Sequence, residues 1–310
     1  MKKKSNHEIA ILIPCYNEET TIAKVIKDFA RELPLAEIFV CDNNSSDNTA
    51  LVAQESGAMV VKECKQGKAN AVLRLFEEIS ADIYLMVDGD DTYPASQAKE
   101  LIDVLINNNL DMVVGDRLSN KSYFKENKRA FHSFGNNLTK SLINRFFQAN
   151  QKDILSGYRA FSKRFVKNYS TLIKGFELET DLTIFCLNYN LLTAEIPITY
   201  NDRPDNSCSK LNTYKDGFKV IKTIFNLYRF YNPLNFFTLI SSLLFIVGLV
   251  LMSFPVYEYI QFQYVYKVPT LIISGTIILV SLLLFITGLI LDSIMKIDRK
   301  STILKIRETL

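Results

Sequence analysis

Short apolar runs alternate with amphipathic segments along the first part of the chain. The apolar runs are rich in β-branched residues and lead into polar residues, a pattern typical of buried strands. After the first run, apolar positions recur every three or four residues, which predicts a helix packed by one face on a sheet. The strands are expected at 8–14, 37–42, 58–62 and 83–87, and the helix at Ile22, Val25, Ile26, Phe29 and Leu33. Such alternation predicts a mostly parallel sheet with helices on both faces.

Two long apolar segments near the C-terminal end show a different pattern. Residues 236–254 and 270–291 contain no charged side chain, and each is near the roughly 20 residues with which a helix crosses a bilayer. A buried hairpin of two core helices is the alternative, but helices in soluble proteins need a polar face. Basic residues precede the first segment and follow the second, whereas the loop between them contains only Lys267. The positive-inside rule therefore predicts two transmembrane helices with both chain termini in the cytoplasm.

The segment before the first span has the pattern of an amphipathic helix. Across 214–233, Phe218, Ile221, Phe225 and Tyr228 share one helical face, and basic residues recur beside them. Such a helix is typical of the inner membrane interface, although a core helix of a soluble domain can have the same pattern. The amino terminus has a basic start but no apolar signal core, so the preceding part is expected in the cytosol. The expected divisions are a catalytic domain over 1–211, an interfacial helix over 212–233 and a membrane domain over 234–310.

The composition agrees with a membrane protein and limits its chemistry. Hydrophobic residues make up 48% of the 310 residues and the mean hydropathy is +0.07, an apolar excess that the two spans explain. The formal net charge of +3 is too small to indicate nucleic-acid binding, and anionic lipid headgroups account for the basic residues near the spans. The five cysteines are scattered and lack CxxC spacing, which predicts neither a disulfide framework nor a zinc site.

Polar clusters follow three of the predicted strands, at 16–18, 42–43 and 88–91. The carboxyl ends of parallel strands meet at one sheet edge, where such folds bind ligands. Asp88 and Asp90 stand two residues apart, so their carboxylates can converge on one hard divalent cation, Mg²⁺ or Mn²⁺. An acidic turn that only increases solubility is the simpler alternative for this motif taken alone. The chain has no GxGxxG and no GxxxxGK(S/T) segment, so dinucleotide and P-loop sites lack their motifs.

Nine short motifs follow one another through the cytosolic part of the chain. They are IPCYNEE (13–19), VCDNNSSDNT (40–49), QGKANAV (66–72), VDGDDTYP (87–94), GDRLS (115–119), SGYRAF (156–161), GFELETDL (175–182), EIPITY (195–200) and RPDNSCSKL (203–211). In this order, and with two terminal spans, they resemble family 2 inverting glycosyltransferases of the polyprenyl-phosphate group, which includes dolichyl-phosphate mannose synthase. The resemblance implies the GT-A fold, an α/β fold with a Rossmann-like sheet. The QxxRW motif of processive polysaccharide synthases is absent, since the chain has no tryptophan, so we expect no chain elongation.

The resemblance assigns candidate residues to the sugar donor. Asp88 and Asp90, with Gly89 between them, match the motif that holds a metal ion and the donor diphosphate, where the cation stabilises the leaving nucleoside diphosphate. The residues that match the base and ribose site are Pro14, Tyr16, Glu18, Asp42 and Asn43, and Lys68 is expected beside them. Arg203 and Lys210 match the basic pair of a loop that closes on the donor diphosphate. Many relatives have a second acid at position 43, so this position leaves the expected choice of UDP over GDP open.

The resemblance also assigns residues to the acceptor and to catalysis. The residues that match the acceptor-phosphate region, where guanidinium groups suit phosphate oxygens, are Arg117, Arg129 and Ser133. Asp181, near Glu179, matches an acidic region in which many relatives hold a general base. A phosphate acceptor is already an anion near neutral pH and needs no base, so we expect Asp181 to be a helper only. Arg159 has two open interpretations, a ligand contact or a salt bridge that braces a loop.

The predicted function is the inverting transfer of a hexose or N-acetylhexosamine from a nucleotide-diphosphate sugar to polyprenyl phosphate, such as undecaprenyl phosphate, at the cytoplasmic membrane face. We expect an integral membrane homo-oligomer whose partners are the sugar donor, the lipid acceptor and membrane lipid, with no nucleic acid.

The sequence leaves three alternatives open. One is a membrane-anchored glycosyltransferase with another glycan or lipid acceptor. Another is a phosphatase of the haloacid-dehalogenase type, because residues 88–92 match its DxDxT nucleophile motif; that motif normally lies on the first strand, whereas three predicted strands precede it here. The third is a non-catalytic membrane scaffold that binds a sugar nucleotide.

Overall fold

The structure is a computed structural model of the chain, and it describes residues 7–119, 140–147, 151–171, 177–201 and 213–308. Side chains are described over the same ranges except 213–221. The chain divides into two compact units, the sheet unit (1–224 with 302–310) and the hairpin unit (225–301). The predicted domain boundaries at 211 and 233 stay predictions.

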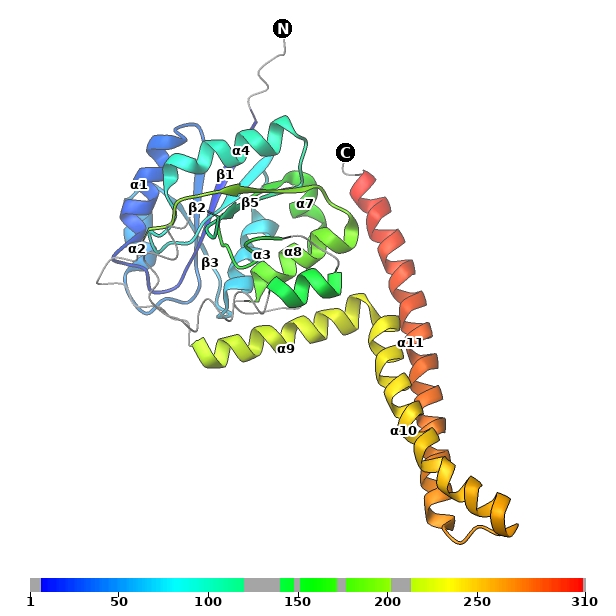
Figure 1. The fold of residues 1–310 in the computed structure, drawn as a ribbon. Helices are drawn as coiled ribbons and strands as arrows, with labels where there is room; N and C mark the ends of the chain where they lie inside the picture. Colours follow the sequence, from blue (N-terminus) through cyan, green and yellow to red (C-terminus); the bar gives the residue numbers. More distant parts are fainter. Residues whose placement is uncertain (1–6, 120–139, 148–150, 172–176, 202–212, 309–310) are drawn as a thin grey trace. The chain divides into compact units, whose positions relative to one another are not determined.

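The sheet unit is built on a seven-stranded sheet within the described ranges, with the order β3-β2-β1-β4-β6-β5-β7 (Figure 1). Neighbouring strands are parallel except that β6 runs antiparallel to both β4 and β5. The strands are β1 (Ile9–Cys15), β2 (Glu37–Asp42), β3 (Met59–Lys62), β4 (Ile83–Met86), β5 (Met112–Asp116), β6 (Arg159–Ser162) and β7 (Thr193–Pro197). The predicted mostly parallel α/β sheet is confirmed.

Helices cover both faces of this sheet (Figure 1). α1 and α4 share a hydrophobic cluster with Ile11 and Ala160 of the sheet. The adjacent Phe161 packs instead against Phe76 of α3 and Phe165 of α7, because successive strand residues point to opposite faces. The helices are α1 (Ile22–Glu32), α2 (Thr49–Glu55), α3 (Lys68–Glu78), α4 (Ala98–Asn107), α7 (Lys163–Asn168) and α8 (Leu178–Tyr189), with the 3₁₀ turn η1 (Ala95–Gln97).

A further helix, α9 (Thr213–Tyr231), occupies the segment for which the sequence predicts an amphipathic helix. The side chains of Phe218 and Ile221 lie outside the described ranges, whereas Phe225 is exposed. The helix is therefore confirmed, and its location at a membrane interface stays a prediction.

The hairpin unit contains most of two long apolar helices, α10 (Pro233–Phe262) and α11 (Val268–Glu308). Both are long and apolar enough to cross a membrane, and they contain the predicted spans. A Cβ atom on Gly248 would lie only 2.7 Å from Cγ1 of Ile278, so the two backbones approach closely. Buried positions in the two helices recur about every seven residues and are mostly small; they include Ser241, Gly248 and Pro255 in α10 and Ser274, Ser281 and Gly288 in α11.

Candidate active site

The carboxyl ends of β1, β2 and β4 lie side by side, since these strands are parallel neighbours. The polar clusters that follow them, at 16–18, 42–43 and 88–91, therefore share one edge of the sheet, as the sequence predicts. The antiparallel β6 begins at this same edge, because its first residue, Arg159, pairs with Met86 at the end of β4. The loop before β6 is thereby added to the site.

Asp88 follows β4 and lies between Lys68 and Gly157. Its Oδ1 atom is 2.6 Å from the Nζ atom of Lys68, the first residue of α3. Its Oδ2 atom lies against the backbone of Gly157, where an added Cβ atom would approach it to 2.6 Å. The Lys68 ammonium is also 2.6 Å from Oε1 of Glu179 in α8. One lysine therefore neutralises part of the charge of two carboxylates.

Lys68 is protonated in this environment. Burial lowers the pKa of its ammonium group, but the charges of Asp88 and Glu179 and their hydrogen bonds outweigh burial and raise the pKa above its usual value. A permanent positive charge therefore lies beside Asp88, and charge-assisted hydrogen bonds from such a group suit the oxygens of a phosphate.

Asp90 and Asp91 have different partners although they are adjacent. Asp90 is buried, and its Oδ1 atom accepts a hydrogen bond of 2.6 Å from the hydroxyl of Thr92. Asp91 has a left-handed backbone, with a φ of 60°, and its Oδ1 atom is 2.7 Å from Nζ of Lys24 in α1. Thr92 thus supports Asp90, whereas Asp91 is directed toward α1.

Gly89 leaves no space for a larger residue between the two acids. A Cβ atom there would lie 2.7 Å from Sγ of Cys15. The carbonyl oxygen of Gly89 accepts a hydrogen bond of 2.6 Å from the hydroxyl of Thr21. The backbone of this turn is therefore fixed against the end of β1 and the start of α1, which orients Asp88 and Asp90.

Asn43 folds the loop that leads to Lys68. Its Nδ2 atom donates to the carbonyl oxygens of Glu63 and Lys65 over 3.1 and 2.8 Å, and its Oδ1 atom accepts from the N–H of Gly67 over 2.6 Å. Gly67 has a φ of 139°, which favours glycine. An ionised aspartate at position 43 would lack the N–H donors that hold this loop. The amide found here therefore has a positioning role for Lys68.

Four more candidates for the nucleotide site lie on β1, on β2 or just after β1. Pro14 and Tyr16 are half-buried, and Glu18 and Asp42 are buried. The Oδ1 atom of Asp42 accepts a hydrogen bond of 3.2 Å from the N–H of Ser45. Their position on the same edge as Asp88 agrees with a base and ribose site, and the role of each stays a prediction.

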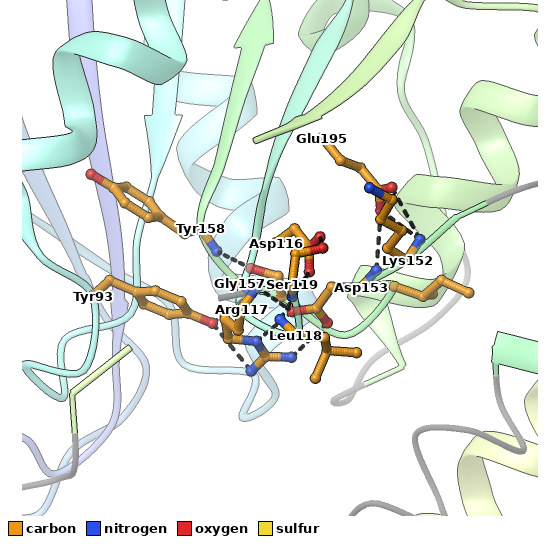
Figure 2. Close-up of polar contacts among 12 residues, drawn as sticks. Tyr93, Asp116, Arg117, Leu118, Ser119, Lys152, Asp153, Gly157, Tyr158 and Glu195 are labelled. Carbon is orange, nitrogen blue, oxygen red and sulfur yellow. Dashed lines mark hydrogen bonds and ion pairs between the residues drawn. The ribbon is translucent and has the colours of Figure 1, made fainter. Parts of the chain in front are cut away.

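Arg117 follows β5 and forms a buried ion pair with Asp153 (Figure 2). Its Nε and Nη2 atoms are 2.7 and 2.8 Å from the two carboxylate oxygens of Asp153, a bidentate arrangement. Burial lowers the pKa of Arg117, but the charge of Asp153 raises it well above its usual value. Nη1 also donates to the hydroxyl of Tyr93 over 3.4 Å, and the guanidinium lies 5.5 Å from the centre of the Tyr200 ring. The predicted contact of Arg117 with an acceptor phosphate stays a prediction.

Side chains of Glu195 and Tyr93 hold the loop that contains Asp153 by accepting hydrogen bonds from its backbone N–H groups. Glu195 of β7 accepts hydrogen bonds from the N–H groups of Lys152 and Asp153 over 2.8 and 3.1 Å, and burial raises the pKa of the Glu195 carboxyl above its usual value. The hydroxyl of Tyr93 accepts a hydrogen bond of 2.9 Å from the N–H of Gly157. These contacts and the ion pair form one network, drawn in Figure 2. The network ends at Gly157, whose backbone lies against Oδ2 of Asp88.

Arg159 and Asp181 are buried with partners of their own. Arg159 donates to the carbonyl oxygens of Ser156 and Ile154 over 2.9 and 2.6 Å, so it braces the loop before β6 through the backbone. Asp181 accepts a hydrogen bond of 2.7 Å from the hydroxyl of Tyr169, and burial raises the pKa of its carboxyl. The helper role expected for Asp181 stays a prediction.

Several residues of this arrangement are not among the predicted site residues. Glu179, Tyr93 and Gly157 lie inside motifs that carry the family resemblance, and that membership is the signal that points to them. Asp153 lies outside those motifs and 36 positions from its partner Arg117, and no local pattern indicates the pairing.

Four predicted site residues lie outside the described residues, namely Arg129, Ser133, Arg203 and Lys210. Of the three candidates for the acceptor phosphate, Arg117 is the one within the described ranges. The expected closing loop stays a prediction.

The two acids after β4 suit a hard divalent cation. Asp88 and Asp90 supply carboxylate oxygens, the ligand type that Mg²⁺ and Mn²⁺ prefer. Within the described ranges, no group of three or more His, Cys, Asp or Glu side chains gathers to hold a metal ion. Two carboxylates fit an ion that takes its remaining ligands from substrate phosphates and water, as Mg²⁺ does. The residues present therefore fit the predicted metal.

Comparison with known proteins points to one family. The family model described as Glycosyl transferase family 2 matches residues 10–170. Glycosyltransferase AglJ of Haloferax volcanii is 33% identical over 298 residues, which cover 94% of this chain and 95% of that protein. Protein RfbJ of Shigella flexneri is 59% identical over 112 residues, 36% of this chain and 87% of that protein. A dolichyl-phosphate hexose transferase of Haloferax volcanii is 28% identical over 218 residues, 70% of this chain and 92% of that protein.

A solved structure shares its fold with most of this chain. Glucosyl-3-phosphoglycerate synthase of Mycobacterium tuberculosis, in complex with Mn²⁺, UDP-glucose and phosphoglyceric acid, has a TM-score of 0.59 and 21% sequence identity. The match covers 73% of this chain and 81% of that chain. At this identity the similarity shows the fold, and the expected GT-A fold is confirmed.

Proposed function

Because the chain belongs to glycosyl transferase family 2 and is a glycosyltransferase, we propose that it transfers a hexose or N-acetylhexosamine from a UDP-sugar to polyprenyl phosphate, with inversion at the anomeric carbon. One observation supports this proposal most. The chain combines two acids and a lysine at a sheet edge, Asp88, Asp90 and Lys68, with two helices long and apolar enough to cross a membrane. A charged donor and a lipid-linked acceptor account for both features.

The donor diphosphate is proposed to bind at Asp88, Asp90 and Lys68. The two acids would hold Mg²⁺ or Mn²⁺, which supplies Lewis-acid stabilisation of the leaving diphosphate. Lys68 adds a positive charge beside Asp88. The choice of UDP is supported by the structurally similar mycobacterial enzyme, which was crystallised with Mn²⁺ and UDP-glucose. Asp42 is a proposed contact of the nucleoside, since it lies on the same sheet edge.

The proposed chemistry is a single displacement. An oxygen of the acceptor phosphate forms a bond to the anomeric carbon while the bond from that carbon to the nucleoside diphosphate breaks, which inverts the configuration. A phosphomonoester is already an anion near neutral pH, so no proton has to leave the nucleophile. A buried Asp181 that accepts a hydrogen bond from Tyr169 agrees with this absence of a general base.

Polyprenyl phosphate is proposed as the acceptor because a relative that covers 70% of this chain is named for dolichyl phosphate. The proposed phosphate contacts are Arg117, Arg129 and Ser133. A polyprenyl chain resides in the bilayer, where α10 and α11 would anchor the enzyme. We place the protein in the cytoplasmic membrane with both termini on the cytoplasmic side, as the distribution of basic residues predicts. The homo-oligomer stays a prediction.

Family membership disfavours the phosphatase and scaffold alternatives and leaves the identity of the acceptor to experiment.

Purified full-length protein would be incubated with Mg²⁺ or Mn²⁺, a panel of labelled UDP- and GDP-sugars, and undecaprenyl phosphate. The expected result is a labelled glycolipid that partitions into organic solvent, and the Asp90→Asn variant should fold and insert but form none. No extractable product from any donor would overturn the proposed acceptor. Undiminished activity of Asp90→Asn would overturn the metal assignment.

A further inference from the structure

A lysine already pairs with Asp88, one of the two proposed metal ligands. The Nζ atom of Lys68 is 2.6 Å from both Oδ1 of Asp88 and Oε1 of Glu179, at the short end of charge-assisted hydrogen bonds. The side chains of Lys68 and Glu179 are only 14% and 6% exposed, and that of Asp88 is 26% exposed. The ammonium is therefore largely shielded from water, and Asp88 is the member of the trio that faces solvent most.

The fold brings this lysine to Asp88 against a local preference. Lys68 is the first residue of α3, where the positive end of the helix dipole disfavours a cation. The two carboxylates that offset this cost come from distant parts of the chain, since Glu179 is 111 positions away. The loop before the lysine is held by the three hydrogen bonds of Asn43. Lys68 of α3, Asp88 after β4 and Glu179 of α8 thus meet at one ammonium group.

Asp88 has little freedom to serve both cations at once. Its Oδ2 atom faces the backbone of Gly157, so the carboxylate cannot move in that direction. A divalent ion bound to Asp88 would lie close to the Lys68 ammonium, and like charges at such a distance repel strongly in a partly desolvated site. The donor diphosphate brings the negative oxygens that can accept the ammonium instead.

We propose that Lys68 and the divalent cation are alternative partners of Asp88, and that Lys68 transfers to the donor diphosphate when the metal ion and the nucleotide bind together. Glu179 acts as a positioning residue that keeps the ammonium within reach of both. Metal binding and nucleotide binding are then coupled, because each removes an obstacle to the other. This inference rests on the proposed function, in which Asp88 holds the metal of a nucleotide-sugar site.

The test measures binding of Mn²⁺ alone to the full-length protein in detergent, by electron paramagnetic resonance of free Mn²⁺. Lys68→Met should bind Mn²⁺ about tenfold more tightly than wild type, because the metal no longer displaces a charge-assisted hydrogen bond. Glu179→Gln should bind it about threefold more weakly, because Lys68 then has a single ionised partner, Asp88. Lys65→Met is the matched control: it removes the same charge from an exposed side chain of the preceding loop, and its affinity should equal that of wild type.

A second series adds UDP. UDP should increase the affinity for Mn²⁺ more in wild type than in Lys68→Met, because only wild type has an ammonium to transfer. Equal or weaker Mn²⁺ binding by folded Lys68→Met would overturn the inference. If that variant does not fold, Glu179→Gln decides, and unchanged or tighter Mn²⁺ binding overturns it. Failure of wild type to bind Mn²⁺ even with UDP would instead overturn the metal assignment in the proposed function.

Discussion

Replacing Gly157 with alanine tests the geometry behind Asp88 directly. The added Cβ atom would lie 2.6 Å from Oδ2 and 3.0 Å from both Cγ and Oδ1 of Asp88. Ordinary van der Waals contact begins at 3.4 Å, so the carboxylate has to move by about 0.8 Å. The Lys68 ammonium, already 2.6 Å from Oδ1, restricts where it can go. The substitution therefore displaces a proposed metal ligand without changing its chemistry.

The size of the effect follows from that displacement. Moving a reacting group by about 1 Å lowers the rate about 100-fold, which corresponds to about 2.7 kcal/mol of lost transition-state stabilisation. The extra methyl group also overpacks the loop before β6, which destabilises a protein by about 1–3 kcal/mol. The two losses have to be measured separately.

The assay is the initial rate of glycolipid formation over a range of donor and Mn²⁺ concentrations, with thermal unfolding measured in parallel. Gly57→Ala is the matched control, because Gly57 has a φ of 96° and an added Cβ atom would meet nothing within 4 Å. Both variants should unfold at a lower temperature, and only Gly157→Ala should lose about 100-fold in kcat/KM. A wild-type kcat/KM for Gly157→Ala would contradict this prediction, because Asp88 would then tolerate the displacement or have no part in the reaction.

Three further substitutions have defined outcomes. Asp153→Asn removes the charge that pairs with the buried Arg117, which should destabilise the protein by about 3–5 kcal/mol in chemical unfolding. Glu195→Gln should flatten the pH dependence of stability above pH 4.5. Burial raises the pKa of the Glu195 carboxyl, so the folded protein holds this proton more tightly than the unfolded chain does. In wild type, stability is therefore lost as pH rises from 4.5 through the folded-state pKa. Gly248→Leu should lower the thermal stability of the hairpin unit, because its Cβ atom would already lie 2.7 Å from Cγ1 of Ile278.

Each of these predictions has an outcome that would contradict it. Unchanged unfolding of Asp153→Asn would show that Arg117 does not depend on this charge. A pH profile of Glu195→Gln that matches wild type would contradict the raised pKa. For Gly248→Leu the control is Val247→Leu, at an exposed neighbouring position, and equal stability of the two variants would contradict close packing of α10 on α11.

The sequence alone determined the main elements of this protein. Buried strands, one amphipathic helix face and two uncharged spans are set by the period of apolar residues, and that period depends on the immediate neighbours of each residue. The three polar strand ends could be placed on one sheet edge because alternating strands and helices imply a parallel sheet. Asp88 and Asp90 were therefore predictable as candidates from local pattern and family resemblance together.

The surroundings of those acids depend on the three-dimensional fold. The alternation of elements does not reveal that β6 runs antiparallel between β4 and β5, yet this strand is what brings Gly157 to Asp88. The contact of Lys68 with Glu179 joins residues 111 positions apart, and the ion pair of Arg117 with Asp153 joins residues 36 positions apart. Such pairings depend on strand order and on the burial of charge, neither of which a local pattern contains.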